Sequence, residues 1–390
     1  DYSDYLRKVW AKQSRYALIK RKVNYNQLKL LKQFPIFSEG RYKGGFQYKQ
    51  LNIRQKPFQQ LAARTIGYHK KQSKSVGIEG AFNYDLKGKN GERLEHRLAG
   101  NEWMPIRERE SFPGKDVITT IDIRFQDIAH QALEDRLYFH DADFGTTILM
   151  EVATGEIKSI VNLKKVDEDK YVEFYNFAIG RSIEPGSTFK MIVAIAALKH
   201  GIINTDTTHS CTGKIEFGDR LYHCWKTNGH GKMNVINAIK QSCDVYFYEI
   251  SKKLGIDKIA EVAKDFGLGQ SFDISMPNQK KGIVPNKKWK KENIGESWYA
   301  GETLISAIGQ GFVLTNPFQL VVMTSIIASD GKMIEPTIIK GNRVSFKMNE
   351  KYSKEIKIIK KAMFQVVNEN KGTAFKSRLE DIKSVSYTHL

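Results

Sequence analysis

The sequence has no run of eighteen apolar residues, which is the length that a membrane-spanning helix needs. Its longest apolar stretches, "MIVAIAAL" and "LVVMTSIIA", have the length of buried core segments. The chain also lacks an initial Met and a signal-peptide pattern, so we expect that its front has been removed. A membrane anchor upstream of residue 1 therefore stays among the alternatives. No internal repeat or low-complexity tract occurs. With 390 residues, 41% of them hydrophobic, the chain can form two domains or more.

Acidic residues are scarce at the front. The first 115 positions hold 10 Asp and Glu against 25 Lys and Arg, whereas the remainder holds 33 against 37. Most of the formal net charge of +19 therefore lies at the front. Such a front favours an anionic partner, either nucleic acid or a membrane surface. The alternative is a lysine-rich solvated surface. No recognised nucleic-acid motif accompanies the charge, so we predict no nucleic-acid partner.

Apolar spacing divides the chain near residue 115. Residues 1–35 are predicted to be helical, with Tyr5, Leu6, Val9 and Trp10 on one buried stripe. A β-branched run from Val117 to Ile123 precedes a segment with helical periodicity. Two β-rich runs, "TTILMEV" and "EIKSIVNL", are joined by Ala153, Thr154 and Gly155, which predicts an antiparallel hairpin.

The stretch "EPGSTFKMIVAIAAL" places Ser187 and Lys190 one helical turn apart at the start of an apolar helix. A serine hydroxyl becomes nucleophilic when a base removes its proton. Burial among Phe189, Met191 and Ile192 would lower the pKa of Lys190 and make it such a base. The alternative is a helix-capping serine beside a lysine that reaches solvent.

A second pair follows about fifty residues later in "QSCDVYFYEI". Ser242 and Asp244 stand two positions apart before an aromatic run. This arrangement offers a hydroxyl that can pass on a proton and a carboxylate that can orient a substrate amide. The alternative is an ordinary helix cap.

These motifs together resemble those of the penicilloyl serine transferases, whose first motif is Ser-x-x-Lys and whose second is Ser-x-Asn or Ser-x-Asp. "LAARTIGY", "GIEGAFNYDLKGKNGER" and "WYAGETLISAIGQGF" narrow the resemblance to class B penicillin-binding proteins. The resemblance implies an α+β fold with a pedestal domain at 1–115 and a transpeptidase domain at 116–384. In the latter, helices flank an antiparallel sheet whose last strands are missing here. Residues 385–390 are expected to be a non-native tail.

The resemblance also assigns roles. Ser187 is the expected acylated nucleophile, Lys190 its general base, Ser242 a proton relay and Asp244 a polar group near the substrate. The implied reaction is peptidoglycan D,D-transpeptidation, which cross-links stem peptides and which β-lactams inhibit covalently. The implied location is the periplasmic face of the bacterial inner membrane. The implied partner is a glycan polymerase of the shape, elongation, division and sporulation family.

The third motif of the family, Lys-Thr-Gly or Lys-Ser-Gly, does not occur in the sequence. Lys371, Gly372 and Thr373 form a decoy, because the family has a similar Gly-Thr-Ala about one strand before that motif. We therefore expect this fragment to have little or no activity.

The sequence is consistent with more than one subfamily and function. The sequence after Ser187 resembles the elongation type, penicillin-binding protein 2, whereas the preceding part resembles the division (septal) type. We favour elongation, and a chimeric chain is the alternative. A penicillin-binding sensor domain and a serine β-lactamase are competing functions that use the same Ser-Lys pair.

All three cysteines fall within 33 residues. With one histidine they form a set that suits a structural zinc ion: Cys211, Cys224, His230 and Cys243. Residues at similar positions in some elongation-type members bind a metal. The resemblance therefore implies a metal site in this chain. The alternatives are a disulfide between Cys211 and Cys224, with Cys243 as a small buried residue, or three core cysteines. No cofactor is expected to be required for catalysis.

Overall fold

The computed structural model describes residues 2–14, 16–49, 55–69, 75–99, 103–168, 170–341, 346–348 and 350–386. The chain forms two compact units. The smaller unit consists of Asp1–Pro57 and Asn90–Phe112, and the larger unit of Phe58–Lys89 and Pro113–Leu390. Residues 58–89, which the sequence assigned to the pedestal, thus pack with the larger unit. The division near residue 115 into pedestal and transpeptidase domains stays a prediction, and most of the predicted tail, 387–390, lies outside the described residues.

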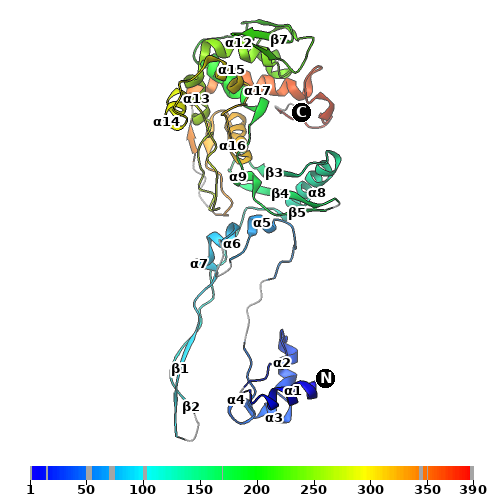
Figure 1. Ribbon diagram of the computed structural model, residues 1–390, viewed down its shortest axis with the longest axis vertical. Coiled ribbons are helices and arrows are strands. Elements are labelled where there is room, and N and C mark those ends of the chain that lie inside the picture. The colour runs from blue at the N-terminus through cyan, green and yellow to red at the C-terminus, as the bar shows by residue number, and fades with distance from the viewer. Residues whose placement is uncertain are drawn as a thin grey trace. The chain divides into compact units, whose positions relative to one another are not determined.

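In the part that the structure describes, the smaller unit contains four short helices and one hairpin (Figure 1). The helices are α1 (Tyr2–Ala11), α2 (Tyr25–Leu31), α3 (Pro35–Ser38) and α4 (Gly40–Lys43). The antiparallel hairpin joins β1 (Glu92–Arg97) to β2 (Trp103–Arg109). The buried stripe predicted on the first helix is wrong, because Trp10 is 84% exposed and Tyr5 and Leu6 are exposed as well.

The larger unit begins with three short helices, α5 (Ala63–Ile66), α6 (Gly77–Ala81) and α7 (Asn83–Leu86). A buried contact ties α5 to the sheet of this unit, because the Arg64 backbone N–H donates to Glu173 Oε2 at 2.7 Å. Burial raises the pKa of Glu173 to about 7, and its Oε1 is buried without a hydrogen-bond partner in the described part of the chain.

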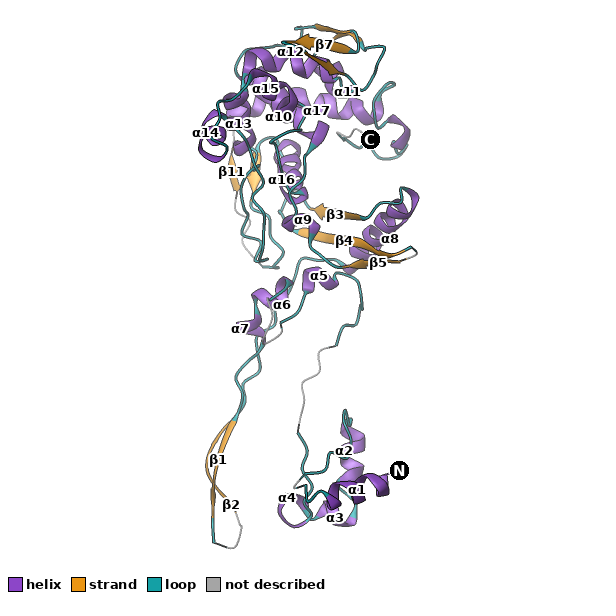
Figure 2. Cartoon of the chain, in the orientation of Figure 1, coloured by secondary structure: helices purple, strands orange, loops and turns teal. Residues whose placement is uncertain are grey.

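The predicted hairpin is confirmed. β3 (Phe144–Met150) and β4 (Ile157–Asp167) pair antiparallel, and β5 (Lys170–Glu173) extends the sheet in the order β3-β4-β5 (Figure 2). Adjacent side chains on a strand point to opposite faces. On β4, Val161 packs in a cluster with Leu133 and Leu137 of α8 (Ile123–Phe139), whereas Ile160 belongs to the main core. Both faces of the central strand are therefore covered, as the α+β prediction required.

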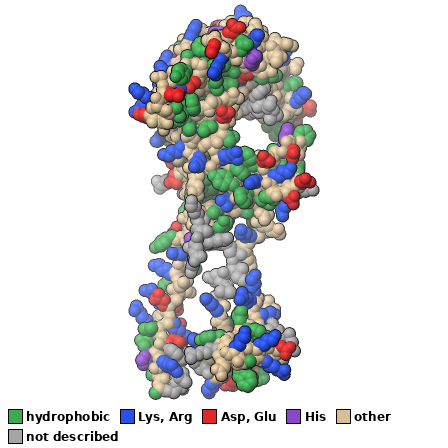
Figure 3. Space-filling view, in the orientation of Figure 1, with side chains coloured by type: hydrophobic (Ala, Val, Ile, Leu, Met, Phe, Trp, Pro, Cys, Tyr) green, Lys and Arg blue, Asp and Glu red, His purple; other side chains and the backbone are tan. Residues whose placement is uncertain are grey.

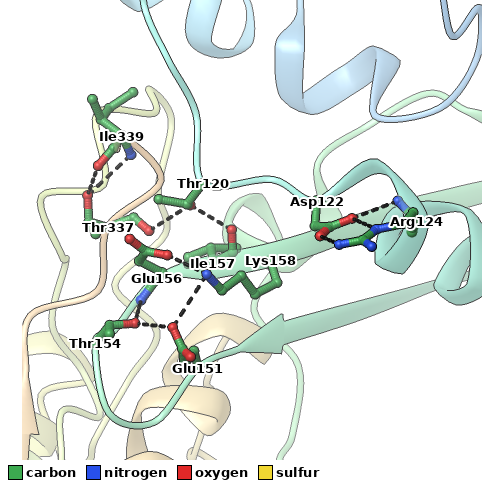
Figure 4. A network of polar contacts seen from close by, with 10 residues as sticks. All are labelled: Thr120, Asp122, Arg124, Glu151, Thr154, Glu156, Ile157, Lys158, Thr337 and Ile339. Carbon is green, nitrogen blue, oxygen red and sulfur yellow. Dashed lines mark hydrogen bonds and ion pairs between the residues drawn. The ribbon is translucent and has the colours of Figure 1, made fainter. Parts of the chain in front are cut away.

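The β-branched run before α8 forms no regular strand. Instead, Thr120 Oγ1 donates to the Ile157 carbonyl at 2.7 Å and to the Thr337 carbonyl at 3.3 Å (Figure 4). At the turn between β3 and β4, Lys158 pairs with Glu156 and lies 3.4 Å from Glu151. This network joins the entry of the domain, the sheet and the segment near residue 337.

The remaining elements form the helical body of the larger unit. Its helices are α9 (Phe177–Gly180), η1 (Gly186–Phe189), α10 (Lys190–Lys199), α11 (Val235–Lys240), α12 (Asp244–Leu254), α13 (Ile256–Asp265), α14 (Lys287–Asn293), α15 (Ala300–Ala307), α16 (Pro317–Ala328), η2 (Glu350–Tyr352), α17 (Ser353–Asn368) and η3 (Phe375–Ser377). Its short strands are β6 (His209–Cys211), β7 (Lys214–Phe217), β8 (Arg220–His223), β9 (Gly231–Met233), β10 (Lys332–Ile334) and β11 (Phe346–Met348).

α10 is the centre of the main core. Its residues from Lys190 to Ala197 are buried, and it contacts α12, α13 and α17. A helix that is apolar on every side needs such complete coverage. Among the described residues, no helix combines the length and the apolar character that crossing a bilayer demands.

Candidate active site

Ser187 lies on the 3-10 turn η1, which runs directly into α10. Gly186 precedes it with φ of 57°, a left-handed conformation that glycine adopts without steric cost. In a 3-10 turn the side chains at positions i and i+3 lie one above the other. Ser187, which is partly exposed, is therefore next to the completely buried Lys190, as the spacing predicted.

Ser242 occupies the short connection between α11 and α12. Its φ is 51°, which is uncommon for a residue with a side chain. This backbone conformation accompanies a fully buried hydroxyl that donates to Ser187 Oγ at 3.1 Å. The structure thus brings the two serines of the two predicted motifs into hydrogen-bond contact, although 55 positions separate them in the sequence.

Three acceptors surround the Lys190 ammonium group. Nζ donates to the Ser242 carbonyl at 3.0 Å, to Ser242 Oγ at 3.0 Å and to Asp244 Oδ1 at 2.6 Å. Lysine has three N–H donors, so this set satisfies all of them. The path from Lys190 to Ser187 therefore runs through the Ser242 hydroxyl.

Burial lowers the pKa of Lys190 from its usual value, while the Asp244 carboxylate opposes that shift. When the amine is neutral, its lone pair can accept a proton from Ser242 Oγ. Ser242 Oγ can then accept the proton of Ser187 Oγ. The geometry therefore permits proton transfer from Ser187 to Lys190 in two short steps.

Asp244, the first residue of α12, has both oxygens engaged inside the protein. Oδ1 accepts from Lys190, and Oδ2 accepts the backbone N–H of Trp225 at 2.9 Å. The side chain is nearly buried. Its contacts are those of a counter-ion for Lys190, and its predicted role as a polar group near the substrate stays a prediction.

The segment after α15 forms hydrogen bonds with the turn that carries Ser187, and the sequence did not indicate this contact. The Gly186 N–H donates to the Gly309 carbonyl at 3.0 Å, and the Gly311 N–H donates to Glu184 Oε1 at 2.8 Å. A Cβ atom at Gly309 would lie 2.1 Å from the Gly186 carbonyl oxygen, so only glycine fits there.

The four residues predicted to hold a metal lie together. The thiols of Cys211, Cys224 and Cys243 and a ring nitrogen of His230 are all within 4.8 Å of one another. His230 Nδ1 is 3.6 Å from Cys211 Sγ and 3.5 Å from Cys224 Sγ. All three cysteines are buried free thiols, so the structure contains no disulfide between Cys211 and Cys224.

This donor set fits a zinc ion. Zinc bond lengths of about 2.0–2.3 Å in a tetrahedron place ligand atoms roughly 3.5–4 Å apart, close to the observed separations. A contact from Cys243 lowers the pKa of Cys224, and the same contact with burial raises the pKa of Cys243. Cys224 is thus the thiol of this pair that ionises more readily.

The metal-ligand set is continuous in the chain with the Lys190 site. Cys224 precedes Trp225, whose N–H binds Asp244, and Cys243 lies between Ser242 and Asp244. The Trp225 indole N–H also donates to the Ser242 carbonyl at 3.0 Å. Trp225 therefore contributes two hydrogen bonds to the site, although no sequence pattern marked it.

A cavity of about 410 Å³ lies elsewhere in the larger unit. Its lining includes Arg64, Ser75, Asn176 and Lys280, and none of the predicted site residues. The chemistry described above is therefore not located in this cavity.

Comparisons with known proteins agree on one family. Residues 145–385 match the family described as the penicillin binding protein transpeptidase domain. The peptidoglycan D,D-transpeptidase MrdA of Acinetobacter baumannii is 29% identical over 343 residues, which is 78% of this chain and 50% of the relative. The chain spans about half the length of the curated relatives it matches.

Two solved structures are similar as well. A complex between penicillin-binding protein 2 (PBP2) and MreC from Helicobacter pylori has a TM-score of 0.70 at 27% identity, covering 82% of this chain and 65% of that chain. A structure described as the coordination of polymerization and crosslinking by a peptidoglycan synthase complex has a TM-score of 0.65 at 28% identity, covering 75% and 56%.

Proposed function

Because the chain belongs to the penicillin-binding protein transpeptidase domain family, as a class B member, we propose that its parent protein is a peptidoglycan D,D-transpeptidase. The observation that carries this proposal is the continuous hydrogen-bonded path from Ser187 through Ser242 to Lys190. It links a partly exposed nucleophile to a buried base.

The first half-reaction is acylation. Ser187 Oγ attacks the carbonyl carbon of the penultimate D-Ala of a stem peptide, and its proton passes through Ser242 to neutral Lys190. The backbone N–H of Ser187 stabilises the developing oxyanion. The C–N bond to the terminal D-Ala then breaks, and its nitrogen takes up the proton held by Lys190, so that D-Ala leaves as a free amine and Lys190 is neutral again. An ester between the stem peptide and Ser187 remains.

The second half-reaction transfers the acyl group. An amine of a neighbouring strand attacks the ester carbonyl carbon, and one of its protons passes to neutral Lys190. The bond between that carbon and Ser187 Oγ then breaks, a new amide bond remains, and Ser187 Oγ takes up the proton from Lys190 through Ser242. A β-lactam follows only the first half, because its opened ring stays attached after acylation. This difference distinguishes the proposal from a serine β-lactamase, which must activate water.

The 390-residue polypeptide is proposed to acylate slowly, because it contains no Lys-Thr-Gly or Lys-Ser-Gly sequence. In the family that motif lies on a strand lining the active site. We therefore define the extended polypeptide as this chain followed by a Lys-Thr-Gly strand segment taken from a relative. The difference in acylation rate between the 390-residue polypeptide and the extended polypeptide measures what that strand contributes.

The test is covalent labelling with a fluorescent penicillin, followed by mass spectrometry of the labelled peptide. The extended polypeptide should form a stable adduct at Ser187, the Ser187→Ala variant should form none, and the chain without the extension should react slowly. Transfer of an acyl group from a D-Ala-D-Ala peptide to an added D-amino acid then separates a transpeptidase from a sensor domain. Absence of an adduct in the extended polypeptide, with its fold intact by circular dichroism, would refute the proposal.

The parent protein is proposed to be of the elongation type, anchored to the inner membrane and acting in the periplasm. The likeness to MrdA and to PBP2 structures supports this type over the division type. The similar peptidoglycan synthase complex supports a glycan polymerase as the partner that supplies the strands to be cross-linked. Co-purification with such a polymerase tests the pairing.

We also propose that Cys211, Cys224, His230 and Cys243 hold a structural zinc ion. Such an ion would supply no chemistry to the reaction and would fix the backbone on both sides of Trp225 and Ser242. The close approach of three free thiols to His230 Nδ1 supports this proposal. Metal analysis of the purified protein tests it.

A further inference from the structure

The apolar face of α1 is largely exposed to solvent. At 100° per residue, Tyr5, Leu6, Val9 and Trp10 cover an arc of roughly 140° on this helix. Three of the four side chains are exposed, and Trp10 is 84% exposed. We define these four residues as the α1 stripe. An exposed apolar stripe of this width usually marks a surface that another phase or molecule covers.

Basic side chains lie on the rest of the same helix. The polar arc of α1 carries the exposed Arg7 and Lys8, and Lys12 follows the helix end. Across residues 1–57 the chain has 14 Lys and Arg against 3 Asp and Glu, a net charge of +11. The stripe is thus set in a strongly positive surface, which favours an anionic partner.

The residues around the α1 stripe are also exposed, and many of them are apolar. Among residues 3–14, 16–41 and 43–49 no residue is buried. Further exposed apolar side chains lie on α2, α3 and the intervening loops: Tyr16, Leu18, Tyr25, Leu30, Phe34 and Ile36. In the space-filling view, apolar and basic side chains both lie on the visible face of α1–α4 (Figure 3).

We propose that the α1 stripe and its flanking basic residues dock on an anionic lipid bilayer surface. Tryptophan and tyrosine suit the interface between headgroups and acyl chains, because an apolar ring carries a polar edge. Leucine and valine add apolar area that inserts at the same depth, and Lys and Arg pair with lipid phosphates. The proposal rests on the smaller unit alone and is independent of the transpeptidase chemistry.

Other occupants fit the surface less well. A second copy of this chain would bring two faces of charge +11 together, which like-charge repulsion disfavours. Single-stranded nucleic acid would use the aromatic rings for base stacking, but the aliphatic side chains Leu6, Leu18 and Ile36 have no role in stacking. A lipid surface uses both kinds of side chain and requires no shaped groove.

The first experiment is sedimentation of the 390-residue chain with phosphatidylcholine vesicles that contain or lack phosphatidylglycerol. Binding should require phosphatidylglycerol and should weaken as salt is raised, because surface charges are screened. The double variant Arg7→Gln, Lys8→Gln should bind more than tenfold more weakly, since each basic residue near the surface contributes about fivefold. The matched control Lys287→Gln, Lys288→Gln removes the same charge from exposed α14 and should bind like the wild type.

The second experiment reports insertion of Trp10 itself. Lipids brominated near the headgroup should quench part of the tryptophan emission of the wild type, and the Trp10→Phe variant should lose that quenched component. Trp10→Ala should reduce binding on the order of tenfold through lost apolar area. Thermal unfolding of each variant checks that the larger unit is unchanged.

Four results would overturn the proposal. They are equal binding to both vesicle types, equal loss of binding in the α14 control, absence of quenching at Trp10, and a Trp10-dependent dimer or oligonucleotide complex that vesicles do not displace. Labelling by penicillin does not enter any of these outcomes, so the docking surface and the proposed transpeptidase function are tested separately.

Discussion

Lys190 Nζ lies 3.0 Å from Ser242 Oγ, and Ser242 Oγ lies 3.1 Å from Ser187 Oγ. Ser242 Oγ therefore lies between the proposed base, Lys190, and the proposed nucleophile, Ser187. Because Lys190 is completely buried, Ser242 is also the group through which the amine reaches the surface side of the site. Most of the proposed chemistry follows from this arrangement.

Replacement of Ser242 by alanine should abolish the relay. In the extended polypeptide, we expect Ser242→Ala to slow acylation of Ser187 by labelled penicillin about 10²- to 10⁴-fold, the usual contribution of general base catalysis. The matched control is Ser251→Ala on α12, whose buried hydroxyl donates to the Tyr248 carbonyl at 2.9 Å. A Ser242→Ala rate within a few-fold of the control would show that Lys190 acts on Ser187 by another path.

Replacement of Asp244 by asparagine should change the pH dependence of acylation. Burial lowers the pKa of Lys190 and the Asp244 carboxylate opposes that shift, so Asp244→Asn should lower the pKa further. Because the neutral amine is the active base, the acidic limb of the pH-rate profile should move to lower pH. Asp219→Asn, at an exposed position, should leave the limb in place.

The lowered pKa of Lys190 should also make the free energy of unfolding depend on pH. Between the lowered folded pKa of Lys190 and its usual value of 10.5, the unfolded chain binds the extra proton. The free energy of unfolding should therefore rise with pH across that window, and the window should extend to lower pH in Asp244→Asn. Urea titrations at several pH values measure this slope. An acidic limb that moves to higher pH in Asp244→Asn would contradict the counter-ion role.

The sequence predicted the contacts between residues that lie close together along the chain. Ser187 and Lys190 are three positions apart, so their adjacency follows from any helical turn. The cysteine and histidine set was also predictable, because few other uses bring those side chains together within such a short segment. The paired runs on either side of Gly155 were predicted for the same reason, since hairpin register is a short-range property.

Tertiary packing decided what the sequence did not indicate. Periodicity identified the apolar face of α1, but it contains no information about what covers that face. The Gly311 contact with Glu184 spans 127 positions. Trp225 acts through its backbone N–H and through an indole directed at a carbonyl, and neither contact has a sequence pattern. Asp244 became a counter-ion because α12 begins beside α10.

Glu173 should make the free energy of unfolding of the larger unit depend on pH in the mildly acidic range. Its pKa is about 7 in the folded protein because it is buried, above the usual 4.5. Between these values the folded chain holds the extra proton, so stability is fully present below pH 4.5 and is lost as the pH rises to 7. The loss is up to about 3 kcal/mol. Urea unfolding of Glu173→Gln should show no such dependence, whereas a slope equal to that of the wild type would place its origin elsewhere.

Removal of the proposed zinc ion should loosen the Ser242 connection. Emission spectrometry should find one zinc per chain, and the three thiols should react with Ellman's reagent only after a strong chelator is added. His230→Ala should lower the zinc content and the melting temperature, because it removes a ligand from a closed site. His223→Ala is the matched control, since His223 is adjacent to Cys224 in sequence but is exposed and outside the cluster.

The effect of zinc on catalysis should be indirect. Trp225 and Cys243 connect the metal ligands to Asp244 and Ser242, so loss of the ion should disorder the relay while leaving Ser187 on its own turn. In the extended polypeptide, chelation should therefore slow acylation of Ser187 and readdition of zinc should restore it. The Ser242→Ala variant should lose little more on chelation, because its relay is already absent. If chelation slowed that variant as strongly as the wild type, zinc would act through something other than the Ser242 connection.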